Sequence, residues 1–288
     1  MGRFVEADGV RLHYVEAGEG PPLVLLHGLG STVEDLALSG LITEASKRYR
    51  VLAFDRPGYG YSERPRRLGW HPGAQARVLR TALRKLDAHR PIVLAHSWGT
   101  LVAAALTLDF PGAVRSLVLL SGLYFPSLRL DAPLLIPPAV PLVGGLLRHT
   151  VSPLAGRLMW PLWLKTIFAP APVPDRFSAG FPAWMALRPS QLLALAQESF
   201  ITLPATLDLA KRYKELTLPV VIVAGDKDRY VNRRHSLRLH RLLRNSELIL
   251  APGAGHMVHH VDLPRVLAAL EIAAMSGKNR NPSPVPAY

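Results

Sequence analysis

The sequence contains no cysteine among its 288 residues. Disulfide bonds, metal sites built on thiolates and a cysteine nucleophile are therefore excluded. The sequence also lacks an apolar signal core at its N-terminus, and no uncharged apolar run reaches the ~18 residues that a membrane span needs. We therefore expect a cytoplasmic protein without an integral membrane span.

Acidic residues are few: 21 Asp and Glu residues stand against 34 Lys and Arg residues, which gives a formal net charge of +13. A large positive charge is typical of proteins that bind nucleic acids. Here the basic residues are scattered through predicted helices and loops, and one marked group, residues 229–244, has the helical spacing of a solvated face. We therefore predict no nucleic-acid partner, although loose affinity for anionic surfaces or anionic substrates stays open.

Hydrophobic residues are plentiful at 49%, enough for a large core. Apolar runs and helical periodicities alternate along the chain after a hairpin expected at residues 5–16. Strands are expected at residues 23–27, 51–55, 92–96, 114–121, 220–224 and 248–251, with helices at 71–89 and 98–109. This alternation predicts an α/β fold with a mostly parallel sheet, which carries its ligands at the carboxyl ends of the strands.

The most informative stretch is residues 93–105, where an apolar strand runs into Ser97 and an Ala/Leu-rich helix follows at once. A serine on such a sharp turn is held in a strained backbone with its hydroxyl exposed, as a nucleophile needs. The flanking Ala95 and Gly99 are small, which leaves room where strand and helix nearly touch. Ala95 stands where the usual Gly-x-Ser-x-Gly pattern has its first glycine.

Three further turns follow predicted strands. A glycine-rich turn at residues 27–30 comes after the strand at 23–27, Gly225-Asp226-Lys227-Asp228 follows the strand at 220–224, and a turn ending at His256 follows the strand at 248–251. The candidate side chains thus occur in the order Ser, Asp, His. This order is that of the α/β-hydrolase elbow and differs from the order in other serine-triad folds.

With these four motifs, the sequence resembles the α/β-hydrolase superfamily over roughly Phe4 to Met275. Within it, the chain resembles the serine hydrolases with a helical cap, a group of esterases, cofactor-free haloperoxidases and C–C hydrolases. The resemblance implies a mostly parallel eight-stranded sheet flanked by helices, built from residues 1–121 and 219–276. It implies a helical cap at residues 122–218 and no cofactor or metal. The composition of residues 277–288 is that of a disordered tail.

The resemblance also implies the chemistry of three residues. Ser97 would be the nucleophile, and His256 would accept its proton and deliver it to the leaving group. Asp226 and Asp228 compete as the acid that orients the histidine. The resembling families place this acid three residues after the glycine, here Gly225, which favours Asp228.

An oxyanion would be stabilised by two backbone N–H groups, those of Trp98 and Leu29. The remaining histidines near these motifs have other expected roles. His27 is expected to shape its turn through hydrogen bonds, and His96 to be packed away from Ser97. His259 and His260, on the helix after His256, are expected to be structural or to face solvent, and the segment at residues 55–62 to be a turn that shapes the sheet edge.

The cap segment, residues 122–218, is rich in proline and bulky apolar residues and poor in acids. Most of its aromatic side chains are expected to pack the cap's own core, but some should face the cleft because a cap closes over the nucleophile. The candidates for the substrate pocket are Trp160, Trp163, Phe168, Phe181 and Trp184.

The nucleophile separates the possible reactions. Haloalkane dehalogenases and epoxide hydrolases of similar layout use an aspartate there, often followed by Trp and Gly. This chain keeps Trp98-Gly99 but has Ser97, which favours acyl transfer through an acyl-enzyme. We predict a carboxylic ester hydrolase for a small to medium apolar substrate.

A C–C bond hydrolase, a cofactor-free haloperoxidase acting as a perhydrolase, and an amidase of the same fold are the enzymatic alternatives. A ligand-binding receptor without turnover is disfavoured because all three triad positions are filled. The sequence does not indicate the oligomeric state.

Overall fold

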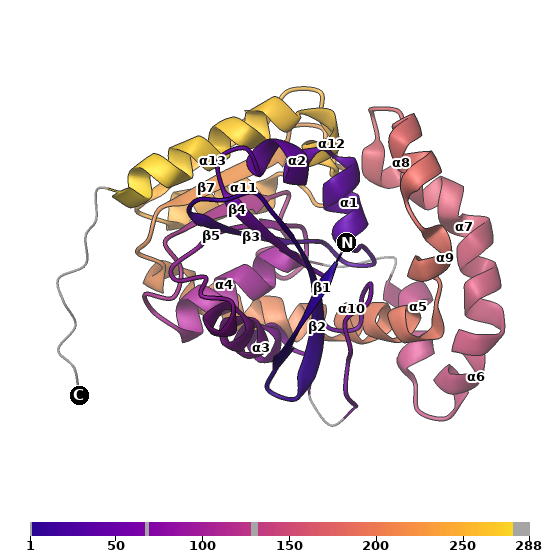
Figure 1. Cartoon of the computed structure of the whole chain (residues 1–288). Helices are drawn as coiled ribbons and strands as arrows, with labels where there is room; N and C mark the ends of the chain where they lie inside the picture. The colour runs from indigo at the N-terminus through magenta and orange to yellow at the C-terminus, as the bar shows by residue number, and fades with distance from the viewer. Residues whose placement is uncertain (1, 67–68, 128–131, 279–288) are drawn as a thin grey trace.

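The computed structural model describes residues 2–66, 69–127 and 132–278. Its centre is an eight-stranded sheet in the order β1-β2-β4-β3-β5-β6-β7-β8 (Figure 1). The strands are β1 (Arg3–Ala7), β2 (Val10–Ala17), β3 (Pro22–Leu26), β4 (Arg50–Phe54), β5 (Ile92–His96), β6 (Ser116–Leu120), β7 (Val220–Gly225) and β8 (Ser246–Ala251). The pairs β1–β2 and β2–β4 are antiparallel and the other pairs are parallel. The predicted mostly parallel eight-stranded sheet is confirmed.

The central strands are buried along their whole length. Every residue of β5, β6 and β7 is buried, as expected for parallel strands covered on both faces. The first hairpin turns at Asp8-Gly9, where both residues have a positive φ, 52° and 73°. Such a two-residue turn matches the twist of the strands that it joins.

Helices cover both faces of the sheet. On one face lie α3 (Pro72–Lys85), α4 (Gly99–Asp109) and α11 (Arg234–Leu242). On the other face lie α1 (Val33–Leu38), α2 (Leu41–Ala45), α12 (Val258–Val261) and α13 (Leu263–Lys278). Each set packs apolar side chains against the strands, so the core is two layers separated by the sheet.

Residues between β6 and β7 leave the sheet and form helices of their own. They are α5 (Ala132–Leu135), η1 (Pro137–Ala139), α6 (Val143–His149), α7 (Val151–Phe168), α8 (Asp175–Gly180), α9 (Ala183–Ala186), α10 (Pro189–Arg212) and η2 (Tyr213–Glu215). Figure 1 shows α6 to α9 on one side of the molecule, while α10 runs back beneath the sheet. A separate apolar cluster joins α7 and α8 to Met257, just before α12.

The chain's last described helix is longer than the sequence suggested. α13 continues to Lys278, so the tail predicted from residue 277 begins at least two residues too early. Arg115 stabilises this helix end, because its Nη2 donates to the carbonyl of Ala274 at 2.8 Å. The rest of the predicted tail, residues 279–288, lies outside the described residues. Among the described helices, none has the length and apolar character needed to cross a bilayer.

Candidate active site

Ser97 lies on the turn between β5 and α4. Its φ of 51° is in the left-handed region, which non-glycine residues rarely adopt. The turn is tight: a Cβ at Gly99 would lie 2.6 Å from the carbonyl oxygen of His27, so that position requires glycine. The backbone N–H of Ser97 donates to the carbonyl oxygen of Leu120 at 2.9 Å, which connects the turn to β6. The serine is therefore fixed at the carboxyl end of the sheet by its surroundings.

A chain of hydrogen bonds connects three of the predicted residues. Nε2 of His256 lies 3.0 Å from Oγ of Ser97, and Nδ1 of the same ring lies 2.9 Å from Oδ2 of Asp228. All three side chains are buried. Because a carboxylate only accepts hydrogen bonds, Nδ1 of His256 carries the proton and Nε2 can accept one from the serine.

The two candidate aspartates have separate partners. Oδ1 of Asp228 accepts the backbone N–H groups of Tyr230 and Val231, at 2.9 and 2.8 Å, which leaves Oδ2 directed at the histidine. Oδ1 of Asp226 accepts the backbone N–H of Gly253 at 2.7 Å. The structure thus brings Asp228 to His256 and uses Asp226 to hold the turn before it.

The two predicted oxyanion donors are the backbone N–H groups of Leu29 and Trp98. Leu29 lines the cavity into which Ser97 opens, and Trp98 follows Ser97 directly. Within the described part of the chain, neither backbone N–H forms a hydrogen bond. Both groups are therefore available as hydrogen-bond donors.

A buried ion pair supports the turn that carries Leu29. Arg56 forms a bidentate pair with Glu198 of α10, at 2.7 and 3.1 Å. The same guanidinium donates to the carbonyls of His27 and Gly28, at 3.0 and 2.9 Å. The Gly28 carbonyl belongs to the peptide whose N–H is that of Leu29, so these bonds orient the candidate oxyanion donor. The sequence predicts only a turn for the segment around Arg56 and does not reveal this role.

His27 completes the support of this turn, as expected. Its Nδ1 donates to the Gly28 carbonyl at 2.8 Å, and its Nε2 accepts the backbone N–H of Arg56 at 2.9 Å. Burial, together with the positive charge of Arg56, lowers the pKa of His27 to about 4. The ring is therefore neutral near pH 7, which matches its use of one nitrogen as donor and the other as acceptor.

A second buried group lies beside the site. Oδ1 of Asp35 accepts from Nε2 of His259 and Nε2 of His260, at 3.2 and 2.7 Å, and Oδ2 accepts the hydroxyl of Ser31 at 2.9 Å. These partners outweigh burial and hold the pKa of Asp35 well below its usual value. The two histidines are thus structural, as predicted, but neither faces solvent.

His96 connects this group to the candidate triad. Its ring centroid lies 4.9 Å from that of His256 and 4.5 Å from that of His259, and its Nε2 donates to the His256 carbonyl at 3.1 Å. Burial and the neighbouring histidines hold the pKa of His96 well below its usual value. His96 lines the cavity beside Ser97, whereas the sequence suggested that it packs away from it.

Metal ligands could come only from Asp35, His96 and His259 among the described residues, and their donor atoms lie within 4.8 Å of one another. Asp35 accepts hydrogen bonds from Nε2 of both His259 and His260. Nδ1 of His96 and Nδ1 of His259 are buried without a hydrogen-bond partner in the described part of the chain.

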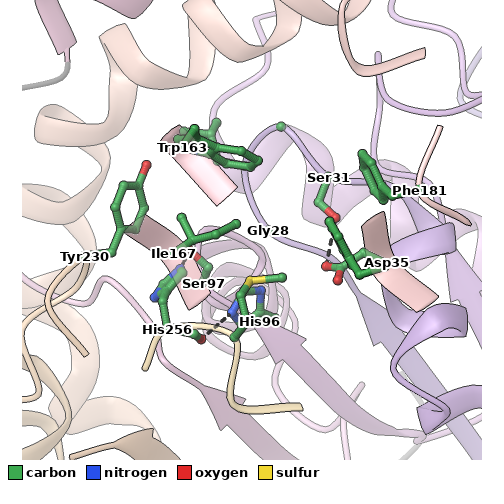
Figure 2. A pocket seen from close by; sticks show the side chains of 14 residues that line it. Gly28, Ser31, Asp35, His96, Ser97, Trp163, Ile167, Phe181, Tyr230 and His256 are labelled. Carbon is green, nitrogen blue, oxygen red and sulfur yellow. Dashed lines mark hydrogen bonds between the residues drawn. The ribbon is translucent and has the colours of Figure 1, made fainter. Parts of the chain in front are cut away.

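The cavity over Ser97 is narrow and mostly apolar. Figure 2 shows Trp163 and Ile167 of α7 above Ser97 and His256, with Phe181 on the far side near Asp35. No Arg or Lys is among its described lining residues, and Asp35 is its one carboxylate.

Only some of the five predicted pocket residues line the cavity. Trp163 and Phe181 line the cavity. Trp160 does not line the cavity but packs against both of these residues: its ring centroid lies 5.3 Å from that of Trp163 and 5.6 Å from that of Phe181. Phe168 is fully buried against Phe177 and His260. Trp184 lies outside the cavity and is 63% exposed.

Several cavity residues were not predicted. The large apolar and aromatic ones among them are Ile167, Phe177, Tyr230 and Met257. Ile167 follows Trp163 by four residues in α7, and this spacing could have identified it.

Comparisons with known proteins give a consistent result. A sequence model of a family described as alpha/beta hydrolase fold matches residues 21–263. The 2-hydroxy-6-oxo-2,4-heptadienoate hydrolase of Pseudomonas putida is 28% identical over 270 residues, which cover 90% of each chain. The 2-(acetamidomethylene)succinate hydrolase of Mesorhizobium japonicum is 26% identical over 274 residues, 94% of each chain. Among solved structures, an alpha/beta hydrolase fold protein from Burkholderia ambifaria superimposes with a TM-score of 0.79 at 24% identity, covering 93% of this chain and 96% of that chain.

Proposed function

Because the chain belongs to the alpha/beta hydrolase fold family, we propose that it is a serine hydrolase that cleaves neutral, apolar carboxylic esters through an acyl-enzyme on Ser97. The observation that carries this proposal is the buried hydrogen-bond chain from Ser97 through His256 to Asp228. An unassisted serine hydroxyl is too weak a nucleophile at neutral pH, and this chain supplies the base that it needs.

The proposed reaction has two steps. His256 Nε2 takes the proton of Ser97 Oγ as this oxygen attacks the ester carbonyl carbon, and the N–H groups of Leu29 and Trp98 bind the oxyanion. The C–O bond to the alcohol then breaks, and the alcohol leaves with the proton from His256. In the second step water loses a proton to His256, attacks the acyl-enzyme and releases the carboxylic acid, and Ser97 regains its proton.

The cavity wall supports a neutral substrate. Trp163, Ile167 and Phe181 offer apolar surface to an acyl chain, whereas no described lining residue is an Arg or Lys. The buried carboxylate of Asp35 lines the same cavity and would repel the carboxylate of a bound substrate, since charges interact strongly where water is excluded.

A C–C bond hydrolase is the second candidate, because one relative is named 2-hydroxy-6-oxo-2,4-heptadienoate hydrolase. Both of the relatives' names denote substrates that carry carboxylates. The described cavity wall offers no Arg or Lys side chain to pair with such a group. We therefore rank the neutral ester first.

A matched substrate panel tests this ranking. p-Nitrophenyl acetate, butyrate and octanoate are compared with p-nitrophenyl hemisuccinate, the ring-cleavage product 2-hydroxy-6-oxo-2,4-heptadienoate and a peracid assay. We expect kcat/KM for butyrate to exceed that for the anionic hemisuccinate by about tenfold or more, with no turnover by Ser97→Ala. Faster turnover of the dienoate than of every ester would replace ester hydrolysis by C–C cleavage.

A further inference from the structure

The helix α7 is apolar on both of its faces. Its inner side contributes Trp163, Leu164 and Ile167 to the cavity and the apolar cluster beneath. Its outer side carries a stripe of large apolar side chains at helical spacing, which we call the outer face of α7. These residues are Val151, Leu154, Leu158 and Leu162, exposed by 58%, 63%, 74% and 58%. A helix that is apolar all round is normally covered on all sides.

The exposed apolar surface is not confined to that stripe. Leu142, Val143 and Leu146, just before or within α6, are also more than half exposed, and Met159 of α7 is 50% exposed. Figure 1 shows α6 and α7 at the outer edge of the molecule, on the side away from the sheet. Contiguous apolar surface of this kind on a protein marks a site of interaction with a partner or a membrane.

The charged side chains of α6 and α7 are all positive. The sequence from residue 142 to residue 168 contains no Asp or Glu, but it contains Arg148, Arg157 and Lys165. Arg157 and Lys165 are exposed, and in the described part of the chain neither forms an ion pair. The whole chain carries a formal charge of +13. An apolar stripe flanked by cations is complementary to a partner that has an apolar interior and anionic groups at its surface.

We propose that the outer face of α7 docks on the surface of an anionic phospholipid bilayer. Its apolar side chains would enter the boundary between headgroups and acyl chains, while Arg157 and Lys165 reach the phosphates. The inner face of the same helix lines the cavity at Ser97, so docking places that cavity next to the lipid. The proposal goes beyond ester hydrolysis and does not depend on it.

The charges also argue against a second copy of the chain as the occupant. In a two-fold dimer, a surface patch meets the same patch of its partner. Two copies of this face would bring only positive charges together, because the α7 sequence offers no acid to pair with Arg157 or Lys165 of the other copy. Anionic lipid supplies that missing charge.

Vesicle sedimentation with the full chain tests the proposal. Vesicles of equal parts phosphatidylglycerol and phosphatidylcholine are compared with vesicles of phosphatidylcholine alone, at low and high salt. We expect the protein to bind the anionic vesicles and to be released as salt rises. The double variant Leu154→Ser/Leu158→Ser should lower the partition coefficient about tenfold or more. Lys165→Gln should lower it about five-fold, on anionic vesicles only.

Met275→Ser is the matched control, because Met275 is 60% exposed and belongs to α13. Figure 1 shows this helix well away from α7. It should bind vesicles like the wild type. The melting temperature of each variant shows that it is folded, as expected for exposed positions. Equal binding by the double variant and the wild type, or no binding to either vesicle, would overturn the proposal. Sedimentation equilibrium that shows a dimer abolished by the double variant, without vesicle binding, would assign the face to a second copy instead.

Discussion

The ring of His256 is held on several sides at once. Asp228 accepts from its Nδ1 at 2.9 Å, while the rings of His96 and Tyr230 each lie with centroids 4.9 Å from its own. These contacts restrict rotation of the imidazole and keep Nε2 directed at Ser97. The proposed base thus owes its orientation to packing as well as to the carboxylate.

The proposed roles of the two aspartates can be separated by isosteric changes. Asp228→Asn should lower kcat on p-nitrophenyl butyrate by about 10⁴-fold, because the amide no longer fixes the required tautomer of His256. Asp226→Asn should leave kcat nearly unchanged, since its side-chain oxygen can still accept from Gly253. Circular dichroism would show that both variants are folded. A larger loss in Asp226→Asn would contradict the assignment.

The candidate site residues that the sequence predicted, and that the structure brings together, lie on turns that follow strands. Ser97, Asp228 and His256 each follow a strand, and the parallel sheet brings such turns together. Arg56 and Glu198 are 142 positions apart, and neither belongs to a local pattern that reveals the other. Read alone, Glu198 in α10 resembles a solvent-facing helical acid, whereas it is fully buried.

At the scale of elements, the Arg56–Glu198 pair joins α10 to the sheet. Glu198→Gln keeps the shape of the side chain but leaves the buried guanidinium without its counter-charge. We expect a loss of about 3–5 kcal/mol in the free energy of unfolding, measured by urea denaturation. Glu215→Gln is the control, because its ion pair with Arg212 is exposed and is worth about 0–1 kcal/mol. Equal effects of the two changes would contradict a special role of the buried pair.

The helices beyond the sheet should set substrate preference through a few side chains. Trp163→Ala removes a cavity wall and should shift the optimum of the p-nitrophenyl ester series toward longer acyl chains. Trp184→Ala is the matched control, since this side chain lies outside the cavity. The profile of kcat/KM against chain length checks both. A uniform loss over all esters, parallel to a lower melting temperature, would show that Trp163 is only a packing residue.

Element boundaries differ from the sequence predictions where the backbone takes a positive φ. The helix expected to reach residue 89 ends at Lys85, and Asp87 and Arg90 have φ values of 50° and 46°. The strand expected to end at Ser121 ends one residue earlier, and the φ of Ser121 is 45°. These positions carry no glycine, so the sequence gives little sign of the change in backbone direction.

At the scale of the whole molecule, buried neutral histidines should make stability depend on pH. The pKa of His27 is about 4 in the folded chain and 6.5 in the unfolded one, so the unfolded state binds more protons between these values. The free energy of unfolding should therefore fall as pH decreases through that window, by about 3 kcal/mol from His27 alone. Burial also lowers the pKa values of His96 and His259, which act in the same direction.

Urea denaturation at about pH 7 and about pH 5 measures this effect. His89→Gln is the control, because the side chain of His89 is 77% exposed and the change should leave the pH dependence intact. Stability that is constant or higher at the lower pH would contradict a neutral, buried His27.

The central claim is that Ser97 is the nucleophile, and active-site labelling tests it most directly. After reaction with a fluorophosphonate, peptide mass spectrometry should find the adduct on Ser97 alone, and Ser97→Ala should be neither labelled nor active. Ser121→Ala is a close control, because Ser121 is also a buried serine of positive φ just after a strand, and this variant should label fully. An adduct on another serine, or undiminished activity in Ser97→Ala, would contradict the account.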